Sequence, residues 1–145
     1  MPDRTDTMNR LVGIDYGRKR LGIATCDALG ISVRGWPTIK ASGSDDAVKK
    51  VASFVCEQEV GKIVLGLPLN MDGSHGEMAD EVQRFAAALR KATTLEPVLW
   101  DERLTSTQAK RVLAERGKGG TAKGDVDRIA AALMLESYLR SLPSE

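Results

Sequence analysis

The sequence predicts a single α/β domain in which helices flank a mixed five-stranded sheet. Three apolar segments near the start of the chain are joined by short connections, which favours antiparallel strands. Two later apolar segments each follow a stretch with helical periodicity, as parallel strands with crossover helices do. With right-handed crossovers, this order gives three antiparallel strands followed by parallel ones.

The 145 residues are enough for one domain with a hydrophobic core, and no repeat marks a second domain. We expect the domain to span residues 10–142, after a flexible tail at residues 1–9. The net charge of +1 gives no overall attraction to nucleic acid. No apolar run approaches the roughly 20 residues of a membrane span, and the N-terminus lacks the apolar core of a signal peptide. These features predict a cytoplasmic protein.

The first half of the chain should form three strands, a helix and a fourth strand. The strands are expected at Arg10–Asp15, from Leu21 and from Gly30. Ser44 resembles a helix cap. The apolar residues that follow at helical spacing are Val48, Val51, Ala52 and Val55. The nearly continuous apolar run from Lys62 then predicts a strand that is buried on both faces and parallel to the first.

The second half should add three helices and a fifth strand. Ser74 and Glu77 have the spacing of a capping box, and Thr105 with Gln108 repeats that signal. The segment from Glu96 to Glu102 predicts the third parallel strand. A final helix should begin near Asp125. Its expected apolar face consists of Val126, Ile129, Ala130, Leu133 and Ser137.

Three carboxylates lie at the ends of the best-defined apolar segments: Asp15, Glu102 and Asp127. The carboxyl ends of parallel strands form the usual site of open α/β sheets, and Gly66 would leave space there between Asp15 and Glu102. Asp127 is expected in the first turn of its helix, where Ala130 and Ala131 permit close approach to the sheet. Oxygen ligands favour Mg²⁺ or Mn²⁺, and two such ions about 4 Å apart support phosphodiester hydrolysis.

Each acid also has an ordinary interpretation. Asp15 could be a turn residue, Glu102 a solvated charge at a strand end, and Asp127 an acid at a helix start. Three further acids are excluded from the cluster. Asp27 should lie at the opposite sheet edge, some 20 Å away, Asp101 should face the other side of the sheet, and Asp125 resembles a helix cap.

The remaining reactive residues have simpler interpretations. Cys26 and Cys56 belong to no C-x-x-C motif, so we expect reduced, partly buried thiols, with an intersubunit disulfide as the alternative. His75 is the only histidine and lies in a predicted loop, where it need not do any chemistry. Histidine-rich zinc catalysis is therefore excluded.

Positive charge is concentrated locally. The segment 103–128 has seven lysines or arginines against three acids, and its glycine-rich centre is expected to be mobile. Arg116, Lys118 and Lys123 could hold a phosphate backbone, or this could be a solvated loop. Arg18, Lys19 and Arg20 follow Asp15 as a second phosphate contact. The few aromatic residues do not favour base stacking.

Four ordered motifs carry a specific resemblance that covers about residues 10–139: G-I-D-Y-G-R-K-R-L-G-I-A, I-V-L-G-L-P-L-N-M-D-G-S, D-E-R-L-T-S and D-R-I-A-A-A-L-M-L-E-S-Y-L. They resemble the YqgF family of resolvase-like proteins with a ribonuclease-H-like fold. The resemblance implies a bacterial cytoplasmic endonuclease that matures the 5′ end of pre-16S ribosomal RNA, acting with ribosomal particles, or that resolves Holliday junctions in some members.

The same resemblance implies Asp15, Glu102 and Asp127 as catalytic acids, with Asn70 and Arg103 as substrate contacts. Cys26 stands where the family often has serine. Two rivals remain. The segment D-Y-G-R-K-R-L-G also resembles the phosphate loop of actin-like ATPases and sugar kinases, but those proteins need two copies of the fold. The other rival is a noncatalytic RNA-binding assembly factor. The sequence does not decide whether the substrate is RNA or branched DNA, nor whether the protein is a monomer or a homodimer.

Overall fold

A computed structural model describes residues 10–27, 32–104 and 123–142, with the side chains of the last helix described from residue 129 onward. The predicted tail at residues 1–9 and the predicted helix after Thr105 therefore lie outside the described residues. In chain order, the regular elements are β1 (Arg10–Asp15), β2 (Arg20–Cys26), β3 (Val33–Lys40), α2 (Ser44–Glu57), β4 (Val60–Leu67), α3 (Glu77–Thr93), β5 (Val98–Asp101), the 3₁₀ helix η1 (Glu102–Leu104) and α5 (Lys123–Ser141).

The five strands form one mixed sheet in the order β3-β2-β1-β4-β5. Strands β1, β2 and β3 pair antiparallel, whereas β4 is parallel to β1 and β5 is parallel to β4. This confirms the predicted sheet, including the position of the third parallel strand beyond the second. The carboxyl ends of β1, β4 and β5 therefore meet at one edge.

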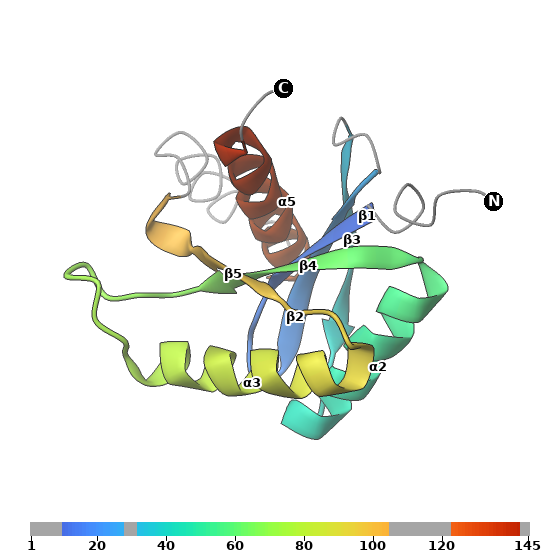
Figure 1. The fold of residues 1–145 in the computed structure, drawn as a ribbon, viewed down its shortest axis with the longest axis horizontal. Helices are drawn as coiled ribbons and strands as arrows, with labels where there is room; N and C mark the ends of the chain where they lie inside the picture. Colours follow the sequence, from blue (N-terminus) through green and yellow to red (C-terminus); the bar gives the residue numbers. More distant parts are fainter. Residues whose placement is uncertain (1–9, 28–31, 105–122, 143–145) are drawn as a thin grey trace.

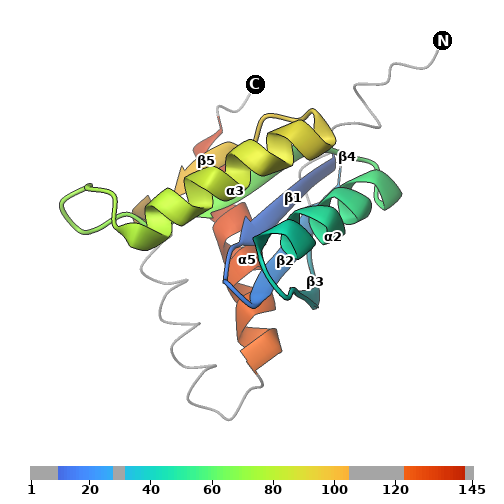
Figure 2. The ribbon, with the colours of Figure 1, turned by 90° about the horizontal axis from the view of Figure 1, so that it is seen from below.

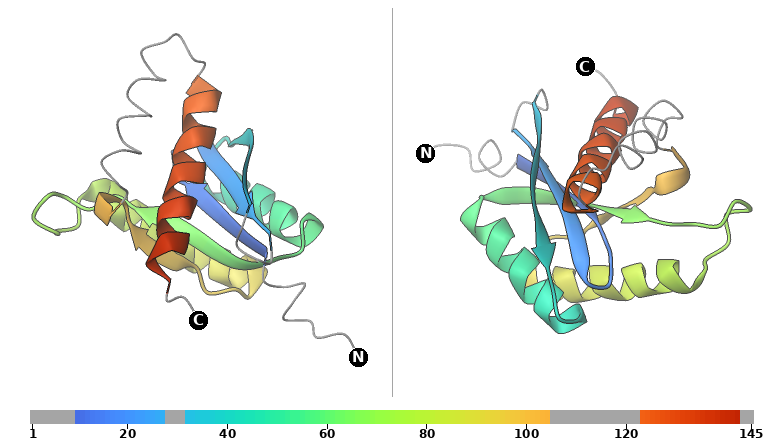
Figure 3. Two further views of the ribbon diagram at one scale, coloured as in Figure 1. Left: turned by 90° about the horizontal axis from the view of Figure 1, so that it is seen from above. Right: turned by 180° about the vertical axis from the view of Figure 1, so that it is seen from behind.

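Helices cover the sheet on both faces (Figures 1 and 2). Helices α2 and α3 lie against one face, and α5 crosses the other, as the view from above shows (Figure 3). Strand β1 serves both layers because successive side chains point to opposite faces. Val12 and Ile14 pack toward α2 and α3, whereas Leu11 packs toward α5.

Two strand glycines let α5 and its neighbours come close to the sheet. A Cβ atom at Gly13 would lie 3.1 Å from Cβ of Leu135 and 3.4 Å from the carbonyl oxygen of Ala131. The predicted close approach at Ala131 is therefore confirmed. A side chain at Gly66 would meet both α5 and η1.

Both described helix caps differ from the prediction. Helix α2 has Gly43 as its N-cap and starts at Ser44, with no side-chain capping bond. Helix α3 has Gly76 as its N-cap and starts at Glu77, so a capping box from Ser74 is absent. The hydroxyl of Ser74 instead donates to Oδ1 of Asp72 at 2.6 Å, because the loop offers a nearer acceptor.

The last strand and the last helix also depart from expectation. Strand β5 ends at Asp101, so Glu102 opens η1 rather than closing the strand. Helix α5 begins at Lys123, which makes Asp125 its third residue, not its cap, and Asp127 its fifth. Its buried side chains are Ala131, Met134, Leu135 and Tyr138. The predicted face was wrong because apolar residues run consecutively from 129 to 135 and do not define one stripe.

The two thiols are free, but only Cys26 is buried, whereas Cys56 is exposed. The prediction of partial burial thus fails for Cys56, which lies near the C-terminal end of α2. Burial raises the pKa of the Cys26 thiol. Among the described residues, no helix is both long and apolar enough to cross a membrane.

Candidate functional site

At the predicted site, the lack of a side chain at Gly66 leaves space for the Glu102 carboxylate. A Cβ atom there would overlap Oε1 of Glu102 and would lie 3.2 Å from its Cδ and 2.8 Å from Sδ of Met134. The Glu102 carboxylate therefore occupies the space over β4 that any larger residue would fill. Gly66 is buried, and Glu102 is half-buried, so the carboxylate sits in a partly enclosed place.

Asp15 stands on the neighbouring strand on the same side of the sheet. Ile14 is in register with Leu65, which places Asp15 beside Gly66 in the next pair. Because Gly13 faces α5, strand alternation puts Asp15 on the α5 face as well. Adjacent strands are about 4.8 Å apart. Asp15 and Glu102 therefore lie on either side of β4, two strand spacings apart as predicted, and the Glu102 carboxylate extends over Gly66 between them.

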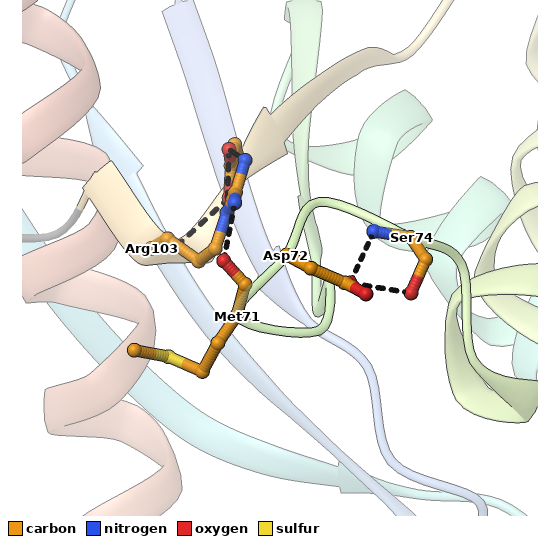
Figure 4. A network of polar contacts seen from close by, with 5 residues as sticks. Met71, Asp72, Ser74 and Arg103 are labelled. Carbon is orange, nitrogen blue, oxygen red and sulfur yellow. Dashed lines mark hydrogen bonds and ion pairs between the residues drawn. The ribbon is translucent and has the colours of Figure 1, made fainter.

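The residues that flank Glu102 are tied to each other (Figure 4). The backbone N–H of Arg103 donates to Oδ1 of Asp101 at 2.9 Å. The Arg103 guanidinium donates from Nε to both Asp101 oxygens, at 3.0 and 3.1 Å, and from Nη2 to Oδ2 at 2.7 Å. These bonds raise the pKa of Arg103 further above its usual value.

Residues 68–76 form a structured loop beside η1. Nη1 of Arg103 donates to the carbonyl oxygen of Met71 at 3.2 Å. Met71 itself is 92% exposed. Asp72 accepts from both the backbone N–H and the hydroxyl of Ser74, which lowers the pKa of its carboxyl. The side-chain amide of Asn70 donates to Ser74 Oγ at 3.0 Å. Asn70 is thus exposed and held near the same edge.

The turn after Asp15 is anchored to α3. The Tyr16 hydroxyl donates to Oε2 of Glu81 at 2.8 Å, and Nε of Arg18 donates to Oε1 at 3.0 Å. Burial and the Glu81 carboxylate raise the pKa of Tyr16 to about 12. The hydrogen bond from Tyr16 lowers the pKa of Glu81. Arg18 and Lys19 are exposed in the turn that follows β1.

The other predicted site residues are distributed as follows. The side chains of Asp127 and Lys123, and all of Arg116 and Lys118, lie outside what the structure describes. Within the described residues, no group of three or more histidines, cysteines or acids lies close enough to hold a metal ion. Asp15 and Glu102 are two acids of the predicted three.

The exclusion of Asp27 and the loop position of His75, both expected from the sequence, agree with the geometry. The residue before Asp27, Cys26, pairs with Leu11, so Asp27 lies at the end of the sheet opposite Asp15. His75 is exposed in the loop, where its Nδ1 lies 3.1 Å from Nε2 of Gln83.

Sequence reasoning missed three residues that organise the site. Glu81 is 65 positions from Tyr16, and no local pattern links them. Asp101 is excluded by sequence because it should face the other side of the sheet from Glu102. However, an aspartate two residues before Arg103 is also the pattern of a side-chain to backbone turn, which the structure contains. Met134 was also missed, since it lies off the predicted face of α5.

The sequence and the fold are similar to those of known nucleases. Residues 9–141 match a family whose description is RuvX, Holliday junction resolvase. A protein of Syntrophus aciditrophicus named "Putative pre-16S rRNA nuclease" is 39% identical over 137 residues, covering 94% of this chain and 91% of the relative. A protein of the same name from Synechococcus elongatus is 43% identical over 129 residues, covering 88% of this chain and 87% of that relative.

Solved structures show the same fold at lower sequence identity. RuvC of T. thermophilus in complex with a Holliday junction substrate superposes with a TM-score of 0.60 and 17% identity, covering 90% of this chain and 94% of that one. The Holliday junction resolvase of fowlpox virus has a TM-score of 0.52 and 16% identity, with coverages of 92% and 99%. The ribonuclease-H-like fold expected from the sequence is thereby confirmed.

Proposed function

The chain belongs to the YqgF family, whose matching description is RuvX, and we propose that it is a metal-dependent endonuclease that hydrolyses phosphodiester bonds of pre-16S ribosomal RNA. The observation that carries the proposal is the Glu102 carboxylate lying over Gly66, beside Asp15. Placing a glycine in a buried strand so that a carboxylate can occupy the space above it lowers stability, which packing alone does not explain. Its value is easily understood in a metal-binding site.

The donor set fits a hard divalent cation. Asp15 and Glu102 offer only carboxylate oxygens, which suit Mg²⁺ or Mn²⁺ better than zinc or copper. Asp127 is the proposed third ligand, and it stands seven residues, or about two helical turns, before Met134 on α5. Residues seven apart on a regular helix lie on the same face, which supports this proposal. When two such ions are bound, they neutralise phosphate charge and activate water for in-line hydrolysis.

The chain's own cations would hold the substrate. Arg18 and Lys19 are exposed three and four residues after Asp15, in the turn between β1 and β2, and are proposed phosphate contacts there, although Arg18 also pairs with Glu81 at 3.0 Å. Asn70 is a further proposed contact through its exposed amide. Arg116, Lys118 and Lys123 are proposed to bind the phosphate backbone, with affinity that falls as salt rises. We place this activity in the cytoplasm, on ribosomal precursor particles.

A cleavage assay with two labelled substrates tests the function. The purified protein and its Asp15→Asn variant are incubated with Mg²⁺ or Mn²⁺ and either a 5′-extended 16S precursor fragment or a four-way DNA junction. We expect metal-dependent RNA cleavage by the wild type alone, with RNA binding retained in the variant. Equal cleavage by Asp15→Asn would contradict the site.

Junction resolution is the second candidate function, because the family description and the structural relatives both concern Holliday junctions. Symmetric nicking of the DNA junction without RNA cleavage would favour it. Since that reaction needs two sites acting together, it also requires a dimer, which sedimentation would detect. RNA binding without any metal-dependent cleavage would instead support the noncatalytic assembly factor.

A further inference from the structure

We propose that Asp101 and Arg103 form a clamp that positions Glu102, so that Arg103 is a positioning residue and not a phosphate contact. The proposal rests on the proposed nuclease function and adds two residues to its machinery. Asp101 had no functional role in the sequence analysis, and Arg103 had a different one.

The clamp is a closed ring around the Glu102 backbone. The Asp101 carboxylate accepts hydrogen bonds from the backbone N–H and from the guanidinium of Arg103. The two residues that flank Glu102 are thereby bonded to each other. Such bonds stabilise the first turn of η1 directly after β5 ends. The turn sets the direction from which the Glu102 side chain reaches the space over Gly66.

The clamp also connects Glu102 to the loop 68–76. Nη1 of Arg103 donates to the Met71 carbonyl oxygen. The loop also passes close to this nitrogen at Gly73, where φ is +86° and an ideal Cβ atom would lie 3.5 Å from Nη1. The left-handed backbone at Gly73 favours glycine there. One guanidinium therefore fixes both η1 and the loop that carries Asn70, the proposed substrate contact.

The electrostatics favour positioning over phosphate binding. The Arg103 guanidinium is in contact with a carboxylate at 2.7 Å, and its side chain is 37% exposed. A phosphate that bound it would come close to the Asp101 carboxylate, whose charge repels it. Lys19 presents an exposed cation in the turn after β1, whereas Arg18 is itself paired with Glu81 at 3.0 Å.

The test separates the two roles with four variants. Arg103→Lys keeps the charge but loses the forked contact, Arg103→Gln loses both, and Asp101→Asn leaves the arginine in place. Arg90→Lys is the matched control, since Arg90 pairs with Glu96 at 3.5 Å on the surface, at the C-terminal end of α3 and outside both η1 and the loop 68–76. Melting temperature and circular dichroism establish that each variant is folded, and Arg103→Lys is the variant least disturbing to packing.

We expect kcat for RNA cleavage to fall about 10- to 100-fold in all three clamp variants, the range for residues that orient metal ligands. Binding of Mn²⁺ alone, followed by electron paramagnetic resonance, should weaken by a similar factor. RNA affinity in EDTA and its salt dependence should stay within about twofold of wild type. The control should match wild type in all three measurements.

Three outcomes would overturn the clamp. Wild-type kcat and Mn²⁺ affinity in Asp101→Asn would show that Glu102 needs no positioning by it. Weaker RNA binding and a shallower salt dependence in Arg103→Gln, with tighter binding in Asp101→Asn, would make Arg103 a phosphate contact. Clamp variants that lose activity only in proportion to their unfolded fraction would reduce the pair to a structural role. Failure of the wild type to cleave would instead contradict the proposed function.

Discussion

The two faces of the sheet differ in what the same strands present to them. Toward α2 and α3, β1 and β4 present Val12, Ile14, Ile63 and Leu65, all completely buried. Toward α5, the adjacent positions include Gly13, Asp15 and Gly66, and the helix approaches through Ala131 and Met134. One face is filled with branched apolar side chains, whereas the other has Leu11 and Val64 but also places Gly13, Gly66 and Asp15 beside them.

Within a single strand, residues facing α2 and α3 therefore contribute mainly to stability, and residues facing α5 include the proposed site. Large apolar side chains on the α2 and α3 face contribute most of the buried apolar surface that holds the sheet. The α5 face gives up part of that contribution so that carboxylates can sit close to the backbone. Neighbouring residues such as Ile14 and Asp15 should therefore respond to substitution in opposite ways.

The largest expected effect comes from Asp15→Asn, which breaks only the α5 face. We expect kcat to fall by about 10³-fold, or about 4 kcal/mol in activation free energy, because Asp15 is a proposed direct metal ligand and should matter more than the residues that support it. Removing one of two nearby negative charges relieves repulsion, so the melting temperature should not fall. Single-turnover cleavage and thermal denaturation on the same preparation check both statements.

Ile14→Ala breaks the opposite face from the adjacent residue. Ile14 is 0% exposed, so truncation should lower the free energy of unfolding by about 2–5 kcal/mol. Activity per folded molecule should remain within about twofold of wild type, since the side chain points away from the acids. Urea denaturation measures the first quantity. Strong loss of activity in a fully folded sample would show that the faces are not independent.

Gly66→Ala sharpens the comparison within the α5 face. The added methyl group would overlap Oε1 of Glu102 and lie 2.8 Å from Sδ of Met134, so we expect both a loss of about 1–3 kcal/mol in stability and at least about tenfold lower kcat.

Gly13→Ala is the matched control for that substitution. Its methyl group would meet Leu135 and Ala131 but no acid, so a comparable loss of stability should leave kcat nearly unchanged. Similar losses of kcat in both variants would mean that general crowding under α5, and not displacement of Glu102, explains the effect.

The smallest expected effect concerns the anchor between Tyr16 and Glu81. The folded-state pKa of Tyr16 is raised from 10.0 to about 12, so its contribution to stability is present below pH 10 and is lost as pH rises toward 12. The pKa of Glu81 is lowered, so its contribution is present above pH 4.5 and is lost as pH falls. Between pH 9 and 12, the melting temperature of the wild type should fall more steeply than that of Tyr16→Phe. Parallel pH profiles would contradict the assignment.

The sequence was sufficient for features that depend on local pattern. The strand at Arg10–Asp15 and the parallel strand after Lys62 follow from apolar periodicity, and the placement of Asp15, Gly66 and Glu102 follows from the rule on strand ends. The role of Asp127 stays a prediction, because its side chain lies outside the described residues.

Features that depend on tertiary choice could not be predicted. Consecutive apolar residues in α5 left its buried face undetermined until the sheet selected Ala131, Met134, Leu135 and Tyr138. Capping at Ser74 competed with the nearby Asp72, and the contact of Tyr16 with Glu81 joins residues far apart in sequence. Local propensity has no information on which of these partners is present.

The position of α5 after all five strands in the chain has a consequence for protein synthesis. Every residue of the sheet, together with α2 and α3, precedes Lys123 in the chain, whereas Met134 and Ala131 belong to the last helix. During translation the α2 and α3 layer can therefore assemble on the ribosome while the opposite face of the sheet still lacks its cover. A nascent chain of this kind would hold Asp15 and Glu102 on an open surface, and the proposed nuclease activity is expected only after α5 has docked.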